Sequence, residues 1–127
     1  MTDELSNNMR TVRGLLNRAF NARQPAEAAA IYLDASYRQH NSIRHGIGAF
    51  VRLAHPYLDA YPELRLTVQL LVADGNLVVA QSLIQRHRHD RGRQVMDTFQ
   101  LANGRIVEHW DVMRDLPENV AQAASAA

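Results

Sequence analysis

The spacing of hydrophobic residues along the chain changes once, near its middle. Up to about residue 60, the apolar side chains recur every three or four positions, which is the spacing that places them on one face of an α-helix. This pattern predicts helices over about 4–23, 25–34 and 47–60. Pro25 suits the first turn of the second helix, whereas Pro56, inside the third, predicts a kink or an early end.

In the second half of the chain, apolar and polar side chains alternate, as in a half-buried β-strand. Asp-Gly, Asp-Arg-Gly and Asn-Gly sequences separate the alternating segments and are typical of hairpin turns. The expected strands cover residues 64–72, 77–87, 94–101 and 105–113. Helices followed by an antiparallel meander predict an α+β fold in which three helices cover one face of a curved sheet. A ligand cavity is expected beneath that face.

Length and composition limit the further possibilities. A chain of 127 residues suits a single domain, and residues 118–127 are expected to form a flexible tail. With 14 basic and 13 acidic residues, the net charge of +1 does not favour nucleic acid as a partner. The absence of cysteine excludes disulfides and thiolate metal sites. Neither an apolar membrane span nor a signal peptide is recognisable, so we expect a cytoplasmic protein without membrane contact.

Three ionisable residues on the last two strands are the main candidates for chemistry. Asp97 lies in the same alternating phase as the apolar residues Val95 and Phe99. It is therefore expected to face the helices. A carboxylate among apolar side chains costs several kcal/mol unless it is paired or protonated. The phase of the last strand is ambiguous. If its His109 and Asp111 face inward, they share one cavity with Asp97.

Two interpretations of these carboxylates remain open at this stage. They are either hydrogen-bonded structural groups or a general acid/base pair whose environments separate their proton affinities. His40, which follows the second helix in the segment 37–41, is likewise either a proton shuttle near neutral pH or a histidine with a local hydrogen bond.

The basic run Arg86–Arg93 and the outer sheet face suggest contacts rather than chemistry. The run is interpreted as a solvated hairpin tip, with an anion contact as the alternative. A metal site at His87 and His89 is disfavoured because the surrounding arginines would repel a cation, and no metal is expected. Trp110 lies in the phase that points away from the helices, together with apolar and polar neighbours. We expect this outer face to form a homodimer interface.

The segments Phe99–Asp111 (FQLANGRIVEHWD) and Tyr37–Asn41 (YRQHN) resemble the SnoaL-like branch of the nuclear-transport-factor-2-like superfamily. The NGRIVEHWD ending is fairly specific to this branch, and the resemblance extends from about Leu15 to Pro117. It implies a cone-shaped α+β barrel, the cystatin-like roll. It also relates the chain to polyketide cyclases, ketosteroid isomerases and limonene epoxide hydrolases.

The resemblance assigns roles to individual positions. His40 falls where ketosteroid isomerases carry their carboxylate base, and Asp97 falls on their protonated oxyanion-hole aspartic acid. Leu16 stands in place of their oxyanion tyrosine, which argues against simple steroid isomerisation. Asp111 matches the acid/base aspartate of SnoaL-type cyclases and one aspartate of limonene epoxide hydrolases. The latter also need an Arg and an Asp where this chain has Ser82 and Ile84, which argues against epoxide opening.

The resulting hypothesis is a cofactor-independent isomerase, cyclase or aldol-condensation enzyme that acts on a small, apolar carbonyl compound. His40, Asp97 and Asp111 are the expected catalytic residues. The residues expected to contact the substrate are Leu16, Asn41, Phe50, Tyr57, Phe99, His109 and Met113. The alternative hypothesis is a non-catalytic small-molecule-binding or dimerisation module of the same fold.

Overall fold

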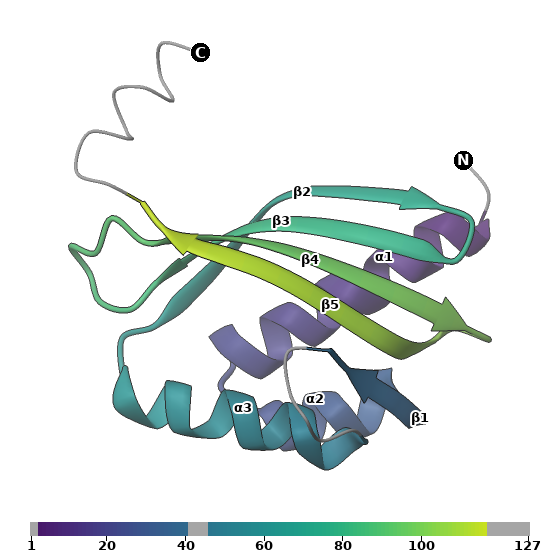
Figure 1. Ribbon diagram of the computed structural model, residues 1–127, viewed down its shortest axis with the longest axis horizontal. Coiled ribbons are helices and arrows are strands. Elements are labelled where there is room, and N and C mark those ends of the chain that lie inside the picture. Colours follow the sequence, from purple (N-terminus) through teal and green to yellow (C-terminus); the bar gives the residue numbers. More distant parts are fainter. Residues whose placement is uncertain (1–2, 41–45, 117–127) are drawn as a thin grey trace, which may run out of the picture.

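The computed structural model describes residues 3–40 and 46–116 (Figure 1). In these residues, three α-helices, one π-helical turn and five strands follow the order α1, η1, α2, β1, α3, β2, β3, β4, β5. Their bounds are Asp3–Leu16, Asn17–Asn21, Pro25–Tyr32, Leu33–Gln39, Ile47–Ala60, Arg65–Asp74, Leu77–Gln85, Arg93–Ala102 and Arg105–Asp115. The predicted tail, 118–127, lies outside the described residues. None of the described helices is long and apolar enough to cross a bilayer.

The five strands form one curled sheet in the order β1-β5-β4-β3-β2. Strands β2 to β5 form the antiparallel meander that the turn sequences predict. Strand β1 adds a parallel neighbour to β5, with Gln39 paired to His109. The sequence pattern indicated extended chain only near Tyr37, whereas the second helix already ends at Tyr32. This early strand matters because it brings residues 37 and 39 beside the last strand.

The helices cover one face of the sheet, as the α+β prediction requires (Figure 1). The buried core between the two layers is almost entirely aliphatic and aromatic. Its largest fully buried side chains include Tyr37, Phe99, Leu15 and Leu33. Removal of this apolar surface from water is the main source of stability for such a packed layer. The fold class predicted from the sequence is confirmed.

Helix α3 covers the predicted residues and continues past Pro56 to Ala60, so of the two alternatives predicted for Pro56 the early end is wrong. Proline leaves the carbonyl of residue 52 without its helical N–H donor. Both Arg52 and Pro56 are exposed, so water can satisfy that carbonyl. The helix therefore remains long enough to line one whole side of the cavity described below.

A β-bulge explains why the phase of the last strand is ambiguous in the sequence. The pairing of β4 with β5 shifts between Gln100 and Leu101, so that Gln100 faces Glu108 while Leu101 faces Ile106. Val107 is the extra residue of the bulge. Ile106 and His109 are consequently both buried although they lie three positions apart. Strict alternation along the whole strand would have placed them on opposite faces.

The hydroxyl of Ser82 is expected to lower the stability of this fold. Ser82 is fully buried on β3, and its Oγ has no hydrogen-bond partner among the described residues. A buried, unsatisfied polar group costs about 1–3 kcal/mol. Ser82→Ala should therefore leave the free energy of unfolding unchanged or raise it by about 1 kcal/mol in urea titrations. Ser36→Ala is the matched control, because the Ser36 hydroxyl donates a hydrogen bond to Asp34. A clear loss of stability in Ser82→Ala but not in Ser36→Ala would contradict the view that the Ser82 hydroxyl is unsatisfied.

Candidate active site

A cavity of about 230 Å³ lies between helix α3 and the inner face of the sheet. Most of its lining is apolar, and the polar exceptions are concentrated on β1, β4 and β5. The lining residues are Leu16, Phe20, Gln39, Phe50, Leu53, Ala54, Tyr57, Leu66, Ile84, Arg93, Val95, Asp97, Phe99, His109, Asp111 and Met113. An enclosed apolar space with a few convergent polar groups is the usual form of a small-molecule site.

The cavity contains a buried cluster of Asp97, His109 and Asp111. Asp97 and Asp111 are direct partners in the β4–β5 pairing, and His109 is two positions before Asp111 on the same face. His109 Nε2 lies 2.7 Å from Asp97 Oδ1 and 4.0 Å from Asp111 Oδ2. The three side chains are 6%, 7% and 13% exposed for Asp97, His109 and Asp111, respectively. Asp111 is thus the most exposed member of the cluster.

Strand β1 holds the other side of the His109 ring. Gln39 Nε2 lies 3.1 Å from His109 Nδ1, and the Tyr37 hydroxyl donates a hydrogen bond to Gln39 Oε1. The ring of His109 also stacks on Phe99, with centroids 4.5 Å apart and planes 9° from parallel. The imidazole is therefore fixed by a hydrogen bond at each nitrogen and by an aromatic ring on its face.

The Tyr37 hydroxyl acts as a donor at any physiological pH. Its pKa is raised far above the usual value, chiefly because the ring is buried and also because the charges of Asp97 and Asp111 disfavour a phenolate. The hydroxyl therefore stays protonated and donates its hydrogen bond to Gln39 Oε1. This contact places the amide nitrogen of Gln39 toward His109.

These contacts define one tautomer of neutral His109. Gln39 Nε2 has only protons to offer, so His109 Nδ1 accepts the hydrogen bond. The proton of the neutral ring is then on Nε2, from which it is donated to Asp97 Oδ1. The chain of donors runs from Tyr37 through Gln39 and His109 to Asp97. It ends on a carboxylate that lines the cavity next to Asp111.

The placement of His40 differs from the prediction. Exposed and buried residues alternate from Ser36 to Gln39, so Tyr37 and Gln39 face the core while His40, just beyond the strand, lies on the opposite side. His40 stacks on Trp110 with ring centroids 4.7 Å apart, and its Nε2 lies 2.5 Å from Glu108 Oε2. It does not line the cavity that contains Asp97 and Asp111. His40 is therefore not positioned as the expected proton shuttle of this site.

The remaining predicted site residues lie mostly where they were expected. Leu16, Phe50, Tyr57, Phe99 and Met113 all line the cavity, as does His109, whereas Asn41 lies outside the described residues. Sequence reasoning missed Gln39 and Arg93 as lining residues and Tyr37 as a hydrogen-bond partner. Tyr37 and Gln39 share a phase in the quoted segment, but polar residues on both faces of β1 left open which phase faces inward.

The cluster also has the atoms that a metal ion would need. One ligand atom each from Asp97, His109 and Asp111 can be chosen so that all three lie within 4.8 Å of one another. His109 Nε2 could coordinate only after losing the proton that it donates to Asp97, because the same nitrogen serves both contacts. The hydrogen bonds of the described residues thus favour a proton-transfer site.

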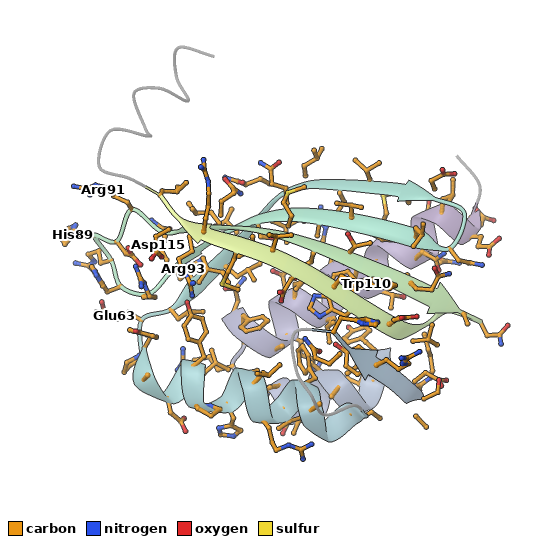
Figure 2. The ribbon with its side chains drawn as sticks, in the orientation of Figure 1. Glu63, His89, Arg91, Arg93, Trp110 and Asp115 are labelled. Atoms are coloured by element: carbon orange, nitrogen blue, oxygen red, sulfur yellow. The ribbon has the colours of Figure 1, made fainter. Side chains whose placement is uncertain are left out.

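Ion pairs hold the basic hairpin, residues Arg86–Arg93, at the start of β4 and the end of β5. Arg86 Nε lies 2.8 Å from Asp90 Oδ2, and Arg93 Nε lies 2.9 Å from Asp115 Oδ1. The Arg86 hydrogen bond is the largest reason why the pKa of Asp90 is well below its usual value. Figure 2 shows Arg93 and Asp115 together at this end, whereas Trp110 lies toward the opposite end of β5.

Comparison with known proteins identifies the family. A SnoaL-like domain model matches residues 12–109, which is most of the chain, and the chain therefore belongs to the SnoaL-like domain family. This result confirms the resemblance seen in the FQLANGRIVEHWD segment. A search of curated proteins found no match.

Solved structures share the same fold. TsrD from Streptomyces laurentii is 21% identical, with a TM-score of 0.72 over 89% of this chain and 91% of that protein. A candidate SnoaL-like polyketide cyclase from Jannaschia sp. CCS1 is 17% identical, with a TM-score of 0.72 over 98% and 94%. A candidate ketosteroid isomerase from Kribbella flavida is 20% identical, with a TM-score of 0.71 over 91% and 83%. At these identities, the likeness extends to the fold alone.

Proposed function

We propose that this SnoaL-like protein is a cofactor-independent acid/base enzyme that acts on a largely apolar carbonyl compound. The observation that carries the proposal is the buried cluster of Asp97, His109 and Asp111 inside an otherwise apolar cavity. Two carboxylates and an imidazole are costly to bury, and such groups collect at sites where protons are moved. The reaction class is isomerisation, cyclisation or aldol-type condensation.

The cluster divides into two parts with different roles. Asp111, the most accessible carboxylate, removes a proton from the carbon next to the substrate carbonyl. The electrons of the broken C–H bond form a C=C bond, and negative charge develops on the carbonyl oxygen. His109 Nε2–H carries the only proton of the Asp97–His109 pair and is shared between Asp97 Oδ1 and this enolate oxygen, which thereby receives a hydrogen bond. Gln39 and Tyr37 hold His109 in the required tautomer.

The competing function is that of a non-catalytic binding module. It uses the same cavity but gives the polar cluster only a structural or ligand-anchoring role. Both functions predict ligand binding, and only the enzyme predicts that bound carbonyl compounds exchange their α-protons faster than in buffer. The exchange rate therefore separates the two.

The test is α-proton exchange in D₂O with a panel of aryl ketones and 1,3-diketones, followed by mass spectrometry. We expect the wild-type protein to incorporate deuterium at the α-carbon. Ala54→Leu should slow this exchange, because Ala54 lines the cavity and a larger side chain fills it. Ala60→Leu is the control on the exposed end of the same helix. EDTA should leave the rate unchanged. Binding without exchange for every compound would favour the binding module, and a rate abolished by EDTA would favour a metal site.

The outer sheet face belongs to a separate part of the proposal. Trp110, Val112 and Met96 expose apolar surface on the side away from the helices. We retain the prediction that this face forms a homodimer interface, since exposed apolar side chains on one sheet face are typical of subunit contacts.

A further inference from the structure

The cavity has a second polar end, which the acid/base function does not use. Arg93 and Tyr57 line the same cavity as Asp97 and Asp111, but they come from the far ends of β4 and α3. Neither residue contacts the Asp97–His109–Asp111 cluster through a hydrogen bond or ion pair among the described residues. Their role therefore requires its own explanation.

Both walls of the cavity place these two residues far from the acid/base cluster. Along β4, Arg93 precedes Asp97 by four residues, which correspond to about 13 Å of extended strand. Along α3, Tyr57 follows Phe50 by seven residues, or about 10 Å of helix. Phe50 marks the cluster end, because its ring contacts Tyr37 with centroids 6.5 Å apart. Arg93 and Tyr57 thus share the opposite end.

Hydrogen-bonding capacity at this second end is unused. The Tyr57 hydroxyl is buried and has no partner among the described residues. Arg93 Nε lies 2.9 Å from Asp115 Oδ1 but makes no aligned hydrogen bond, and the guanidinium has further N–H donors. A buried donor without a partner costs free energy, so an acceptor brought by a ligand would be bound favourably. The donors come from a cationic and a neutral group, which suit a carboxylate.

The second end also lies closer to solvent than the acid/base cluster does. The Arg93 side chain is 27% exposed, compared with 6% for Asp97. Arg86 also lies near this end, since its terminal nitrogen lies 3.8 Å from the Asp115 carboxylate that contacts Arg93, but its charge is paired with Asp90. A ligand with its apolar, carbonyl-bearing end at the cluster would leave a charged group at this more exposed end. Such an orientation avoids burial of the charge among apolar side chains.

We propose that the ligand of this cavity is a keto acid whose carboxylate is bound by Arg93 and Tyr57 while its carbonyl lies at the Asp97–His109–Asp111 cluster. The proposal rests on the acid/base function for the placement of the carbonyl, but the carboxylate site is independent of turnover. An apolar chain or ring system of roughly 10 Å joins the two groups, matching the length of the cavity walls.

The experiment measures binding rather than turnover. Aroylalkanoic acids with two to six methylene groups, and their methyl esters, are titrated into the protein by calorimetry. We expect the wild-type protein to bind one length of acid roughly tenfold to a hundredfold more tightly than its ester, as for a hydrogen-bonded charged group. Arg93→Gln and Tyr57→Phe should each reduce this preference, and the double variant should abolish it.

Matched variants control for charge and folding. Arg88→Gln removes the same charge from an exposed position of the hairpin, and Tyr61→Phe removes a hydroxyl from the ring that packs against Tyr57. Both should retain the wild-type preference. Should Arg93→Gln fail to fold in thermal unfolding, Tyr57→Phe alone decides the outcome. An acid preference that is absent, or unchanged in Tyr57→Phe and the double variant, overturns the proposal. Acid-selective binding without α-proton exchange would instead refute the acid/base function and leave the carboxylate site standing.

Discussion

Asp111→Asn is expected to slow α-proton exchange of a bound carbonyl compound by about 10²–10⁴-fold, the usual contribution of a general base. Asparagine has nearly the same shape as aspartate but cannot accept a proton at neutral pH. The substitution therefore removes the chemistry and leaves the packing of the cavity wall intact. Asp111 is the appropriate target, because its side chain is the most accessible of the three cluster members.

Asp59→Asn is the matched control for this substitution. Asp59 lies on the surface of α3 with its side chain 74% exposed, and it contacts His55 rather than the cavity. It should exchange α-protons at the wild-type rate. Ligand affinity measured by calorimetry should change little in either variant, so that the loss appears in the exchange rate at saturation. A wild-type rate in Asp111→Asn would exclude Asp111 as the base.

The sequence carried enough information to predict the layer architecture. Helical spacing before residue 60 and alternation after it determined which face of each segment could be buried. The turn sequences then predicted the order of the antiparallel meander, because a short turn makes the two strands that it joins antiparallel neighbours, as β2–β3 and β4–β5 show. The inward placement of Asp97 followed from the apolar residues Val95 and Phe99 in the same phase.

The parts that were not predictable depend on contacts between distant segments. Strand β1 is bounded by a helix and contains polar residues on both faces, so its phase gave no information on whether Gln39 or His40 faces inward. Only the parallel pairing of Gln39 with His109, seventy residues away, determines this. The bulge at Val107 likewise depends on the pairing of two strands, because the sequence of β5 alone fits either face. The sequence thus predicted the two carboxylates and His109, but not the residues Tyr37 and Gln39 that fix the orientation of His109.

His109→Leu is expected to cause the largest loss of stability among substitutions in the site. Leucine fills much of the space of the imidazole but removes the partner that lies 2.7 Å from the buried Asp97 carboxylate. Breaking a buried pair by removal of one member costs about 3–5 kcal/mol, because the remaining charge is buried without compensation. The Gln39 amide loses its acceptor at the same time. Urea unfolding followed by circular dichroism measures the difference.

Two further variants separate the lost hydrogen bond from the lost packing. His109→Gln keeps an N–H donor about as far from the backbone as histidine Nε2. This variant should therefore be more stable than His109→Leu. Asp97→Leu combined with His109→Leu removes both polar partners and should be more stable than His109→Leu alone, since a pair of apolar residues leaves no unpaired charge. Equal stability of His109→Leu and His109→Gln, together with a double variant no better than the single one, would mean that Asp97 does not depend on His109. The donor chain from Tyr37 to Asp97 would then be a contact of little energetic importance, and the assignment of His109 as the hydrogen-bond donor to the enolate oxygen would lose its physical basis.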